Sequence, residues 1–175
     1  TFIKIKNELA TQLEFLNPKI EHIGSTSIVD LVAKPIIDIM IGVKNQNQLE
    51  EVINPLICKG YVYFEKFNSV MPNRRFFIKL KSKPENLFIP EVYFEKDEVP
   101  NELNDYKLTH IHIFEYNSYD WKRHIAFRDF LNHFPEIKTE YQQIKKQLSL
   151  LNWKDGSEYN SAKNDFIKTT ELKAM

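Results

Sequence analysis

One acid inside an apolar run is the feature that most constrains how this chain can fold. Residues 34–43 read Lys-Pro-Ile-Ile-Asp-Ile-Met-Ile-Gly-Val, with Asp38 in the middle. The isoleucines and the valine predict a strand at 36–43 that is buried on both faces. A carboxylate is costly to bury unless it binds a cation or a hydrogen-bond donor. Asp38 is therefore a candidate site residue.

A short flexible turn precedes this strand. Residues 20–23 are expected to form a strand that leads into Gly24-Ser25-Thr26-Ser27. Glycine permits a tight turn, and the hydroxyl and backbone N–H of Ser25 are donors that a phosphate accepts. The turn and Asp38 together outline a candidate phosphate and metal site, with Gly24, Ser25 and Thr26 on the phosphate. The alternative is a plain turn, in which a Gly-Ser pair is also common.

Three basic residues are further candidates for binding an anion. Lys34 could pair with a phosphate as a point charge, although a lysine before proline is often solvated. Arg74 and Arg75 could reach an anionic ligand or lie on a solvated face. We expect Lys34 and Arg75 to contribute to the ligand site.

Composition narrows the class of partner. Lys and Arg together number 24 and so do Asp and Glu, so the formal net charge is zero. A neutral chain lacks the attraction that favours nucleic acid or an acidic membrane, and we expect a small-molecule or nucleotide ligand. Cys58 is the single cysteine, which excludes an intrachain disulfide and a cysteine-based zinc site. A single cysteine fits a reducing cytoplasm best, so a cytoplasmic location is expected, and no apolar run approaches the roughly 20 residues that span a bilayer.

Periodicity indicates an α+β chain. Apolar residues at helical spacing predict helices at 2–16, 46–58, 119–133, 135–151 and 159–172. Aromatic and β-branched runs predict strands at 61–67, 75–80, 88–94 and 108–114, and Asp155-Gly156-Ser157 predicts a turn. No linker or repeat divides the chain, so residues 1–175 are expected to form one α+β domain with a helical C-terminal third.

A pair of histidines offers a second set of candidate ligands. His110 and His112 alternate with isoleucines, so in a strand both imidazoles point to one face. If that strand lies beside the strand of Asp38, two imidazoles and a carboxylate meet. Such a set suits Zn²⁺ or Mn²⁺ better than Mg²⁺, or it orients a phosphate with histidine as general acid. The alternative is that both histidines lie on a solvated face.

Several blocks along the chain resemble the GrpB family, small bacterial proteins placed in the nucleotidyltransferase superfamily. The matching blocks are His22–Ser27, Ala33–Ile39, Gly60-Tyr61, His110–Ile113, Phe127–Leu131, Tyr159–Lys163 and Phe166-Ile167. The loop departs from the family, because Ile28-Val29-Asp30-Leu31 replaces its usual Val-Pro-Gly-Leu. The Phe127–Leu131 block contains Arg128-Asp129, which we interpret as a buried ion pair tying a helix to the sheet. Tyr159 and Lys163 are interpreted as structural, although the family pattern there suggests closure over a cleft.

The resemblance implies a nucleotidyltransferase-like mixed β-sheet flanked by helices, with the Gly-Ser turn facing a nucleoside triphosphate. Transfer in that superfamily normally uses two acids one residue apart and a third acid on a later strand, which together hold two divalent cations. Here the second position is Met40, whose thioether is no ligand for Mg²⁺.

Two functions therefore stay open. In the first, the chain is a metal-dependent nucleotidyltransferase that uses a nucleoside triphosphate and a small-molecule acceptor. Asp38 and His112 are then catalytic, and Asp38, His110 and His112 hold a divalent metal, Mg²⁺, Mn²⁺ or Zn²⁺. In the second, the chain binds a nucleotide or phosphorylated metabolite without chemistry.

Overall fold

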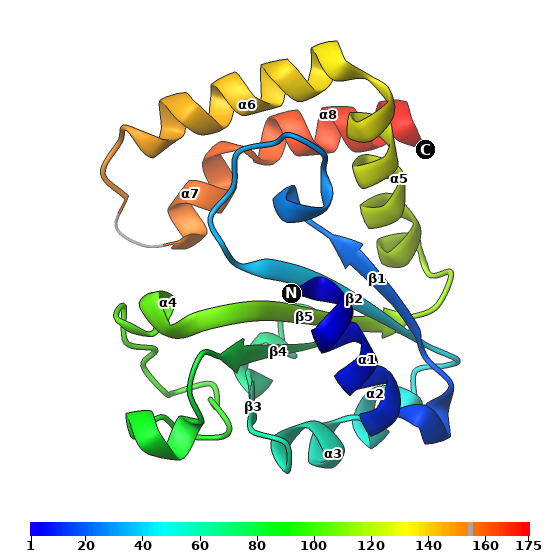
Figure 1. Cartoon of the computed structure of the whole chain (residues 1–175), viewed down its shortest axis with the longest axis vertical. Helices are drawn as coiled ribbons and strands as arrows, with labels where there is room; N and C mark the ends of the chain where they lie inside the picture. Colours follow the sequence, from blue (N-terminus) through cyan, green and yellow to red (C-terminus); the bar gives the residue numbers. More distant parts are fainter. Residues whose placement is uncertain (154–155) are drawn as a thin grey trace.

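A computed structural model describes residues 1–153 and 156–175 (Figure 1). The strands are β1 (Lys19–Ile23), β2 (Ile37–Val43), β3 (Tyr61–Tyr63), β4 (Arg74–Leu80) and β5 (Lys107–Glu115). The helices are α1 (Phe2–Gln12), α2 (Gln48–Glu51), α3 (Ile53–Ile57), α4 (Leu103–Tyr106), α5 (Tyr119–His133), α6 (Pro135–Ser149), α7 (Gly156–Ala162) and α8 (Asn164–Ala174). Short 3₁₀ turns are η1 (Glu14–Leu16), η2 (Ser25–Ser27), η3 (Glu65–Phe67) and η4 (Pro84–Leu87).

The strands form one mixed sheet in the order β1-β2-β5-β4-β3. The central pair, β2 and β5, is parallel, and the other neighbours are antiparallel. The register of the central pair places Asp38 opposite His110 and Met40 opposite His112. The predicted α+β class is confirmed, and the strand of the two histidines lies beside the strand of Asp38.

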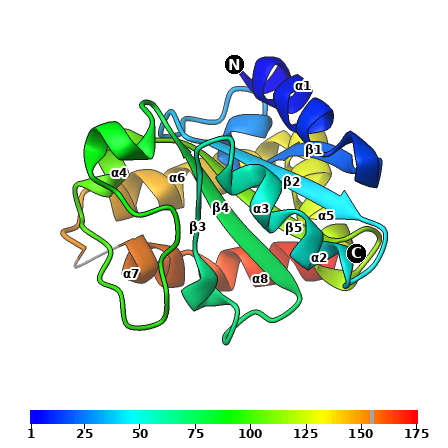
Figure 2. The ribbon, with the colours of Figure 1, turned by 90° about the horizontal axis from the view of Figure 1, so that it is seen from below.

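Each face of the sheet has its own cover. On one face, which we call the α1 face, side chains such as Ile39 and Ile111 pack with α1, α2 and α3 in the largest apolar cluster. Figure 2 shows α2 and α3 in front of the strands when the molecule is seen from below. On the other face, the α5 face, Met40 packs with Phe114 and Trp121 of α5. Because side chains alternate along a strand, Asp38, Met40 and Gly42 all belong to the α5 face.

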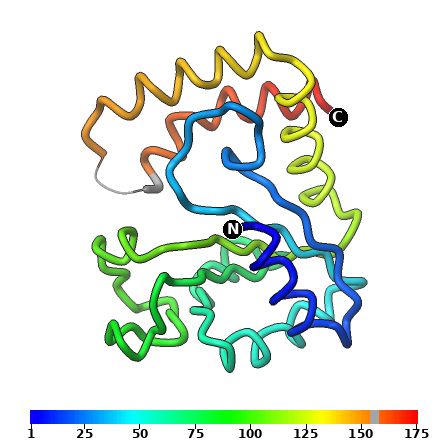
Figure 3. Tube along the Cα trace, viewed as in Figure 1, coloured from blue at the N-terminus to red at the C-terminus, as the bar shows by residue number. Residues whose placement is uncertain are grey.

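The C-terminal helices pack against a loop. Residues 24–36 leave the end of β1, pass next to α6 and α8 and return to β2, as the trace in Figure 3 shows. We call this segment the β1–β2 loop. Its Ile28 and Leu31 are buried with Leu131 of α5 and Tyr141 of α6, and Phe166 and Ile167 of α8 pack on the same cluster. The loop is therefore part of the core of the helical third.

Several predicted elements are shorter or absent. The strand expected at 88–94 is wrong, because only an isolated bridge between Tyr63 and Val92 forms there. Ile89 and Tyr93 pack on an apolar cluster while Phe88 is 97% exposed, so the apolar pattern reflects a packed irregular segment. The strand expected at 61–67 ends at Tyr63 and continues as η3.

The helix boundaries also differ from those expected. The helix at 2–16 ends at Gln12 and is followed by η1, and the helix at 46–58 is divided at Val52 into α2 and α3. The helix at 159–172 begins earlier, at Gly156, and is divided at Lys163. Asp155 of the predicted turn lies outside the described residues, whereas Gly156 already belongs to α7.

The longest described helices are α5 and α6, each of 15 residues. A span of the bilayer core needs about 20 apolar residues. No helix in residues 1–153 or 156–175 is long and apolar enough to cross a membrane.

Candidate functional site

The turn after β1 lies directly against Asp38. Gly24 has φ 68°, a left-handed conformation that glycine adopts without strain, and it precedes η2. A Cβ built on Gly24 would lie 2.2 Å from Oδ2 of Asp38. Only glycine allows the backbone to approach the carboxylate this closely. The predicted proximity of the turn and the acid is therefore confirmed.

Asp38 is paired with the first of the two histidines. Its Oδ1 lies 2.9 Å from Nδ1 of His110, and the two side chains are 26% and 27% exposed. With Nδ1 turned to the carboxylate, Nε2 of His110 is left without a hydrogen bond to any described residue. A carboxylate that fixes one ring nitrogen orients the other nitrogen as a proton acceptor or a metal ligand.

His112 shares the face of His110 but has different surroundings. It packs on Phe76 and His124, with ring centroids 5.1 and 6.2 Å away. Its Nδ1 is buried and has no hydrogen-bond partner among the described residues. Burial, reinforced by Arg74 and His124, holds the pKa of His112 well below its usual range. The structure does not bring His112 into hydrogen-bond contact with Asp38.

A metal would find few protein ligands at this place. Met40 is fully buried under α5 and offers no oxygen. Within the part of the chain that the structure describes, no three His, Cys, Asp or Glu residues are grouped to hold a metal ion. Mg²⁺ is often bound by one or two carboxylates together with substrate phosphates and water. A cation of that kind would find one carboxylate here, that of Asp38.

Two residues of α6 complete the turn side of the site. The hydroxyl of Tyr141 hydrogen-bonds with the side chain of Ser25, and burial raises the pKa of Tyr141 to about 12. One helical turn later, Nζ of Lys145 lies 5.6 Å from the centre of the Tyr141 ring and donates to the carbonyl of Val32 at 2.7 Å. Burial and the nearby Lys163 lower the pKa of Lys145 to about 8, partly offset by Asp38.

A second tyrosine brings two more lysines together. Tyr159 of α7 has Nζ of Lys163 at 4.8 Å from its ring centre and Nζ of Lys34 at 5.9 Å. Burial lowers the pKa of Lys163, and the carboxylate of Asp38 opposes that shift while Lys34 adds to it.

Lys107 extends this set of cations. Burial and the charge of Lys34 lower its pKa, so it lies within electrostatic reach of the β1–β2 loop. We call the four cations the lysine cluster; its members are Lys34, Lys107, Lys145 and Lys163.

The remaining sequence candidates lie elsewhere. The hydroxyl of Thr26 is 2.9 Å from Nε2 of His22, whose ring stacks on Phe2 of α1, so this hydroxyl is engaged by His22. Arg75 belongs to the α1 face, where it pairs with Glu50 of α2. The structure does not bring Arg75 to Asp38.

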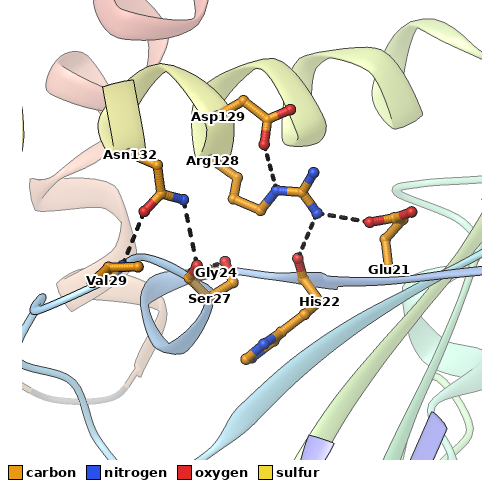
Figure 4. Close-up of polar contacts among 8 residues, drawn as sticks. All are labelled: Glu21, His22, Gly24, Ser27, Val29, Arg128, Asp129 and Asn132. Carbon is orange, nitrogen blue, oxygen red and sulfur yellow. Dashed lines mark hydrogen bonds and ion pairs between the residues drawn. The ribbon is translucent and has the colours of Figure 1, made fainter. Parts of the chain in front are cut away.

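Contacts with α5 hold the β1–β2 loop in place (Figure 4). Arg128 donates from Nη1 to Glu21 at 2.8 Å and to the carbonyl of His22 at 2.9 Å. Asn132 accepts from the backbone N–H of Val29 at 3.0 Å. Arg128 ties the helix to the sheet as interpreted, but its ion pair with Asp129 is not buried, because the Asp129 side chain is 59% exposed.

The surface beside the turn is hollowed. An open depression of about 440 Å³ is lined by the loop itself, with His22, Thr26 and Lys34 among its residues. Another depression, of about 350 Å³, lies between η4 and α4 and is lined by apolar residues such as Leu87 and Tyr93. The first borders the lysine cluster through Lys34.

Sequence reasoning missed Tyr141 and Lys145 as site residues. Both lie on α6, and their proximity to Ser25 and Val32 depends on how α6 packs against the loop. One signal was present, because Lys145 follows Tyr141 by four residues and so shares its helix face.

Comparison with known proteins identifies the family. The family model described as GrpB protein matches residues 1–173. The chain belongs to the GrpB family. Its fold agrees with a crystal structure of the conserved protein GrpB from Enterococcus faecalis, with a TM-score of 0.75 and 29% identity over 99% of this chain and 89% of that one.

Named relatives are similar in sequence to this GrpB-family chain. The glutamate-rich protein GrpB of Alkalihalophilus pseudofirmus is 30% identical over 168 residues, which are 95% of this chain and 84% of that protein. YqkA of Bacillus subtilis is 31% identical over 155 residues, which are 89% of this chain. The match spans only 38% of YqkA.

Proposed function

We propose that this GrpB-family chain binds a nucleotide or another phosphorylated small molecule between the Gly24-Ser25 turn and the lysine cluster. The observation that carries this proposal is the convergence of Lys34 and Lys163 on the ring of Tyr159, with Lys163 within electrostatic reach of Asp38. Lysines repel one another, and burial lowers the pKa of Lys163 and of Lys145. A polyphosphate would remove both penalties, because it supplies the negative charge that the site lacks.

The turn adds directional donors to this charge. The turn brings the backbone of Gly24 against the carboxylate of Asp38, and Ser25 contributes a hydroxyl that already contacts Tyr141. Backbone N–H groups in such a turn bind phosphate oxygens. The lysines then provide attraction, and the turn fixes the position of the phosphate.

Calorimetric titration with tripolyphosphate and with ATP, CTP, GTP and UTP tests this proposal. Tripolyphosphate measures the phosphate contribution alone, and the four nucleotides reveal any preference for a base. Lys163→Ala is expected to weaken binding about tenfold, since a hydrogen bond to a charged group contributes about 1.5–3 kcal/mol. Lys146→Ala is the matched control, because Lys146 is an exposed lysine of α6 outside the cluster. Equal affinity of Lys163→Ala and the parent chain, or no binding to any probe, would contradict the proposal.

Asp38 favours a second candidate function, transfer of a nucleotidyl group. A carboxylate beside a phosphate site only weakens a pure phosphate binder, so its presence is better explained if it holds a cation or aids proton transfer. In such a transfer an acceptor hydroxyl attacks the α-phosphorus, its proton passes to Nε2 of His110, and pyrophosphate leaves. Asp38 would hold the imidazole in the tautomer that leaves Nε2 free.

Asp38→Asn separates the two functions by the sign of its effect. If Asp38 serves a cation, the substitution weakens the binding of ATP with Mg²⁺ or Mn²⁺ and stops pyrophosphate release. The same substitution strengthens the binding of metal-free tripolyphosphate, because a negative charge is removed. If the parent chain binds ATP equally well with and without metal and releases no pyrophosphate, nucleotidyl transfer is contradicted. The function that remains is then ligand binding without chemistry.

A further inference from the structure

Arg74 is a largely buried cation without an anion. It lies on the α5 face of β4, and its Nε is buried with no hydrogen-bond partner in residues 1–153 and 156–175. Its guanidinium forms no ion pair with a described residue. A buried unpaired charge costs several kcal/mol, so arginines in such surroundings are normally paired with a carboxylate or phosphate.

The groups that touch Arg74 orient it without taking its protons. The guanidinium carbon lies 5.3 Å from the centre of the Phe76 ring and 5.9 Å from that of Phe67. Two aromatic faces attract a cation and fix the plane of the guanidinium, but its N–H donors stay available.

The acids around this region are already engaged. Asp120 accepts from Nε of Arg123 at 2.8 Å, and Glu171 accepts from Nη1 of the same arginine at 2.8 Å. Asp120 acts on Arg74 only at a distance, through its charge. No described carboxylate therefore forms an ion pair with Arg74.

A second unsatisfied group lies next to Arg74. Nδ1 of His112 is buried without a partner, and the charge of Arg74 acts on this ring. Nδ1 of His124 lies 2.7 Å from the carbonyl of Asp120 and so is occupied. Arg74 and His112 thus present unused polar atoms on one face of two adjacent strands, where Phe76 stands opposite His112 in the register.

We propose that Arg74, together with Nδ1 of His112, forms a subsite for the oxyanion of a small molecule, a carboxylate or a phosphate group. The planar fork of the guanidinium binds such a group through two parallel hydrogen bonds, and a neutral imidazole donates a third from its N–H. The subsite rests on its own residues and is independent of the lysine cluster.

The subsite shares its sheet face with Asp38 and His110. Arg74 stands opposite Phe114, four residues along β5 from His110, which is about 13 Å of strand. A ligand bound at Arg74 would therefore be a separate molecule from a phosphate at Ser25, or the far end of an extended one.

The test uses malonate as a carboxylate probe and inorganic phosphate as a phosphate probe, at matched ionic strength in sodium chloride. All measurements are made on Lys163→Ala, so that the lysine cluster contributes little. Thermal unfolding reports stabilisation by the probe, and the Nε–H resonance of Arg74, assigned by its absence in Arg74→Gln, reports contact at the guanidinium. We expect either probe to raise the melting temperature and to shift that resonance, and the stronger probe identifies the class of oxyanion.

Three variants make the result specific to Arg74. Arg74→Gln is expected to melt no lower than its parent in chloride, because an unpaired cation is removed, and to lose the response to the probes. Arg74→Lys keeps the charge without the fork and is expected to bind at least tenfold more weakly. Arg75→Gln, next in sequence but on the opposite face and paired with Glu50, is expected to respond as the parent does.

Two results would overturn the subsite. One is a lower melting temperature of Arg74→Gln in chloride together with an unchanged response to both probes, which would make Arg74 a structural partner of the two rings. The other is an Nε–H resonance of Arg74 that neither probe shifts in the parent.

Discussion

Gly24 and Asp38 touch across the site, so closely that a side chain on the first would collide with the second. A Cβ on Gly24 would lie 2.2 Å from Oδ2 and 2.8 Å from Cγ of Asp38. Gly24→Ala is expected to lower the free energy of unfolding by roughly 2–4 kcal/mol, from left-handed backbone strain and overpacking combined. Chemical denaturation measures this change.

Gly60→Ala is the control for that experiment. Gly60 also has a positive φ, 78°, but its added Cβ would meet only Cδ of Pro84, at 3.7 Å. We expect a loss of about 1–2 kcal/mol from backbone strain alone. If the two variants lost equal stability, the close approach of Gly24 to Asp38 would carry no cost.

The proposed phosphate binding should depend on pH through Lys145. Its pKa is lowered to about 8, so the amine is charged below that value and loses its proton as the pH rises through it. We expect the affinity for tripolyphosphate to fall about tenfold more between pH 7 and 9.5 in the parent than in Lys145→Arg, whose guanidinium stays charged. Parallel pH profiles for the two chains would contradict this.

The same shift affects stability in the opposite direction. An unfolded lysine has a pKa of 10.5, so the unfolded chain binds more protons than the folded chain between pH 8 and 10.5. In that window Lys145 makes the free energy of unfolding rise with pH. Denaturation of the ligand-free chain at several pH values, compared with Lys145→Arg, measures this slope.

Arg128 is expected to contribute more to stability than the acid next to it. Arg128 connects α5 to β1 through Glu21 and the carbonyl of His22, so Arg128→Ala should cost about 2 kcal/mol. Asp129→Asn should change stability by less than about 0.5 kcal/mol, because Asp129 is 59% exposed. Urea denaturation measures the free energy of unfolding of both variants. If both lost the same free energy, the stabilisation would come from the Arg128–Asp129 pair and not from the link to β1.

Asp30 occupies a strained position in the β1–β2 loop. Its φ is 62°, and it stands where the usual family pattern has glycine. Asp30→Gly should stabilise the chain by about 0.5–1 kcal/mol, while Asp30→Ala should destabilise it by a similar amount. Both variants remove the carboxylate, so the contrast between their melting temperatures isolates the backbone. If the melting temperatures of Asp30→Gly and Asp30→Ala both rose or both fell relative to the unmodified chain, the lost charge and not the backbone would explain the effect.

The β1–β2 loop lacks the Pro and Gly of the family motif. Without Pro and Gly the turn lacks its preset conformation, yet Asp30 adopts the left-handed backbone that glycine would take. Aspartate tolerates this region better than most residues, because its short side chain can hydrogen-bond locally. The apolar neighbours Ile28 and Leu31 then fix the loop by burial in the helical third.

Local pattern was sufficient for the central strands but not for the segment 88–94. The runs at 37–43 and 107–115 form strands because their β-branched side chains fill both faces of the sheet. Segment 88–94 has similar residues, but Pro90 lacks a backbone N–H and Phe88 has a left-handed φ of 53°. The side-chain pattern alone does not show that the backbone of this segment forms a single isolated β-bridge instead of a strand paired along its length.

The candidate site was predictable where it depended on one pair of strands. Alternation placed His110 and His112 on one face, and the pairing of β2 with β5 then brought His110 to Asp38. Tyr141 and Lys145 could not be placed in this way, because they come from α6, whose packing partner is a loop. The spacing of apolar residues along a helix does not predict which loop that helix will pack against.

Burial of Ile28 and Leu31 among α5, α6 and α8 makes the Gly24-Ser25 turn a continuation of the helical third's interior. Loosening of those helices would uncover two apolar side chains and release the loop, while the large apolar cluster on the α1 face would keep the sheet together. The Gly24-Ser25 turn would thus lose its shape before the strands that flank it. A ligand bound to this turn would therefore also stabilise the packing of the C-terminal helices on the β1–β2 loop.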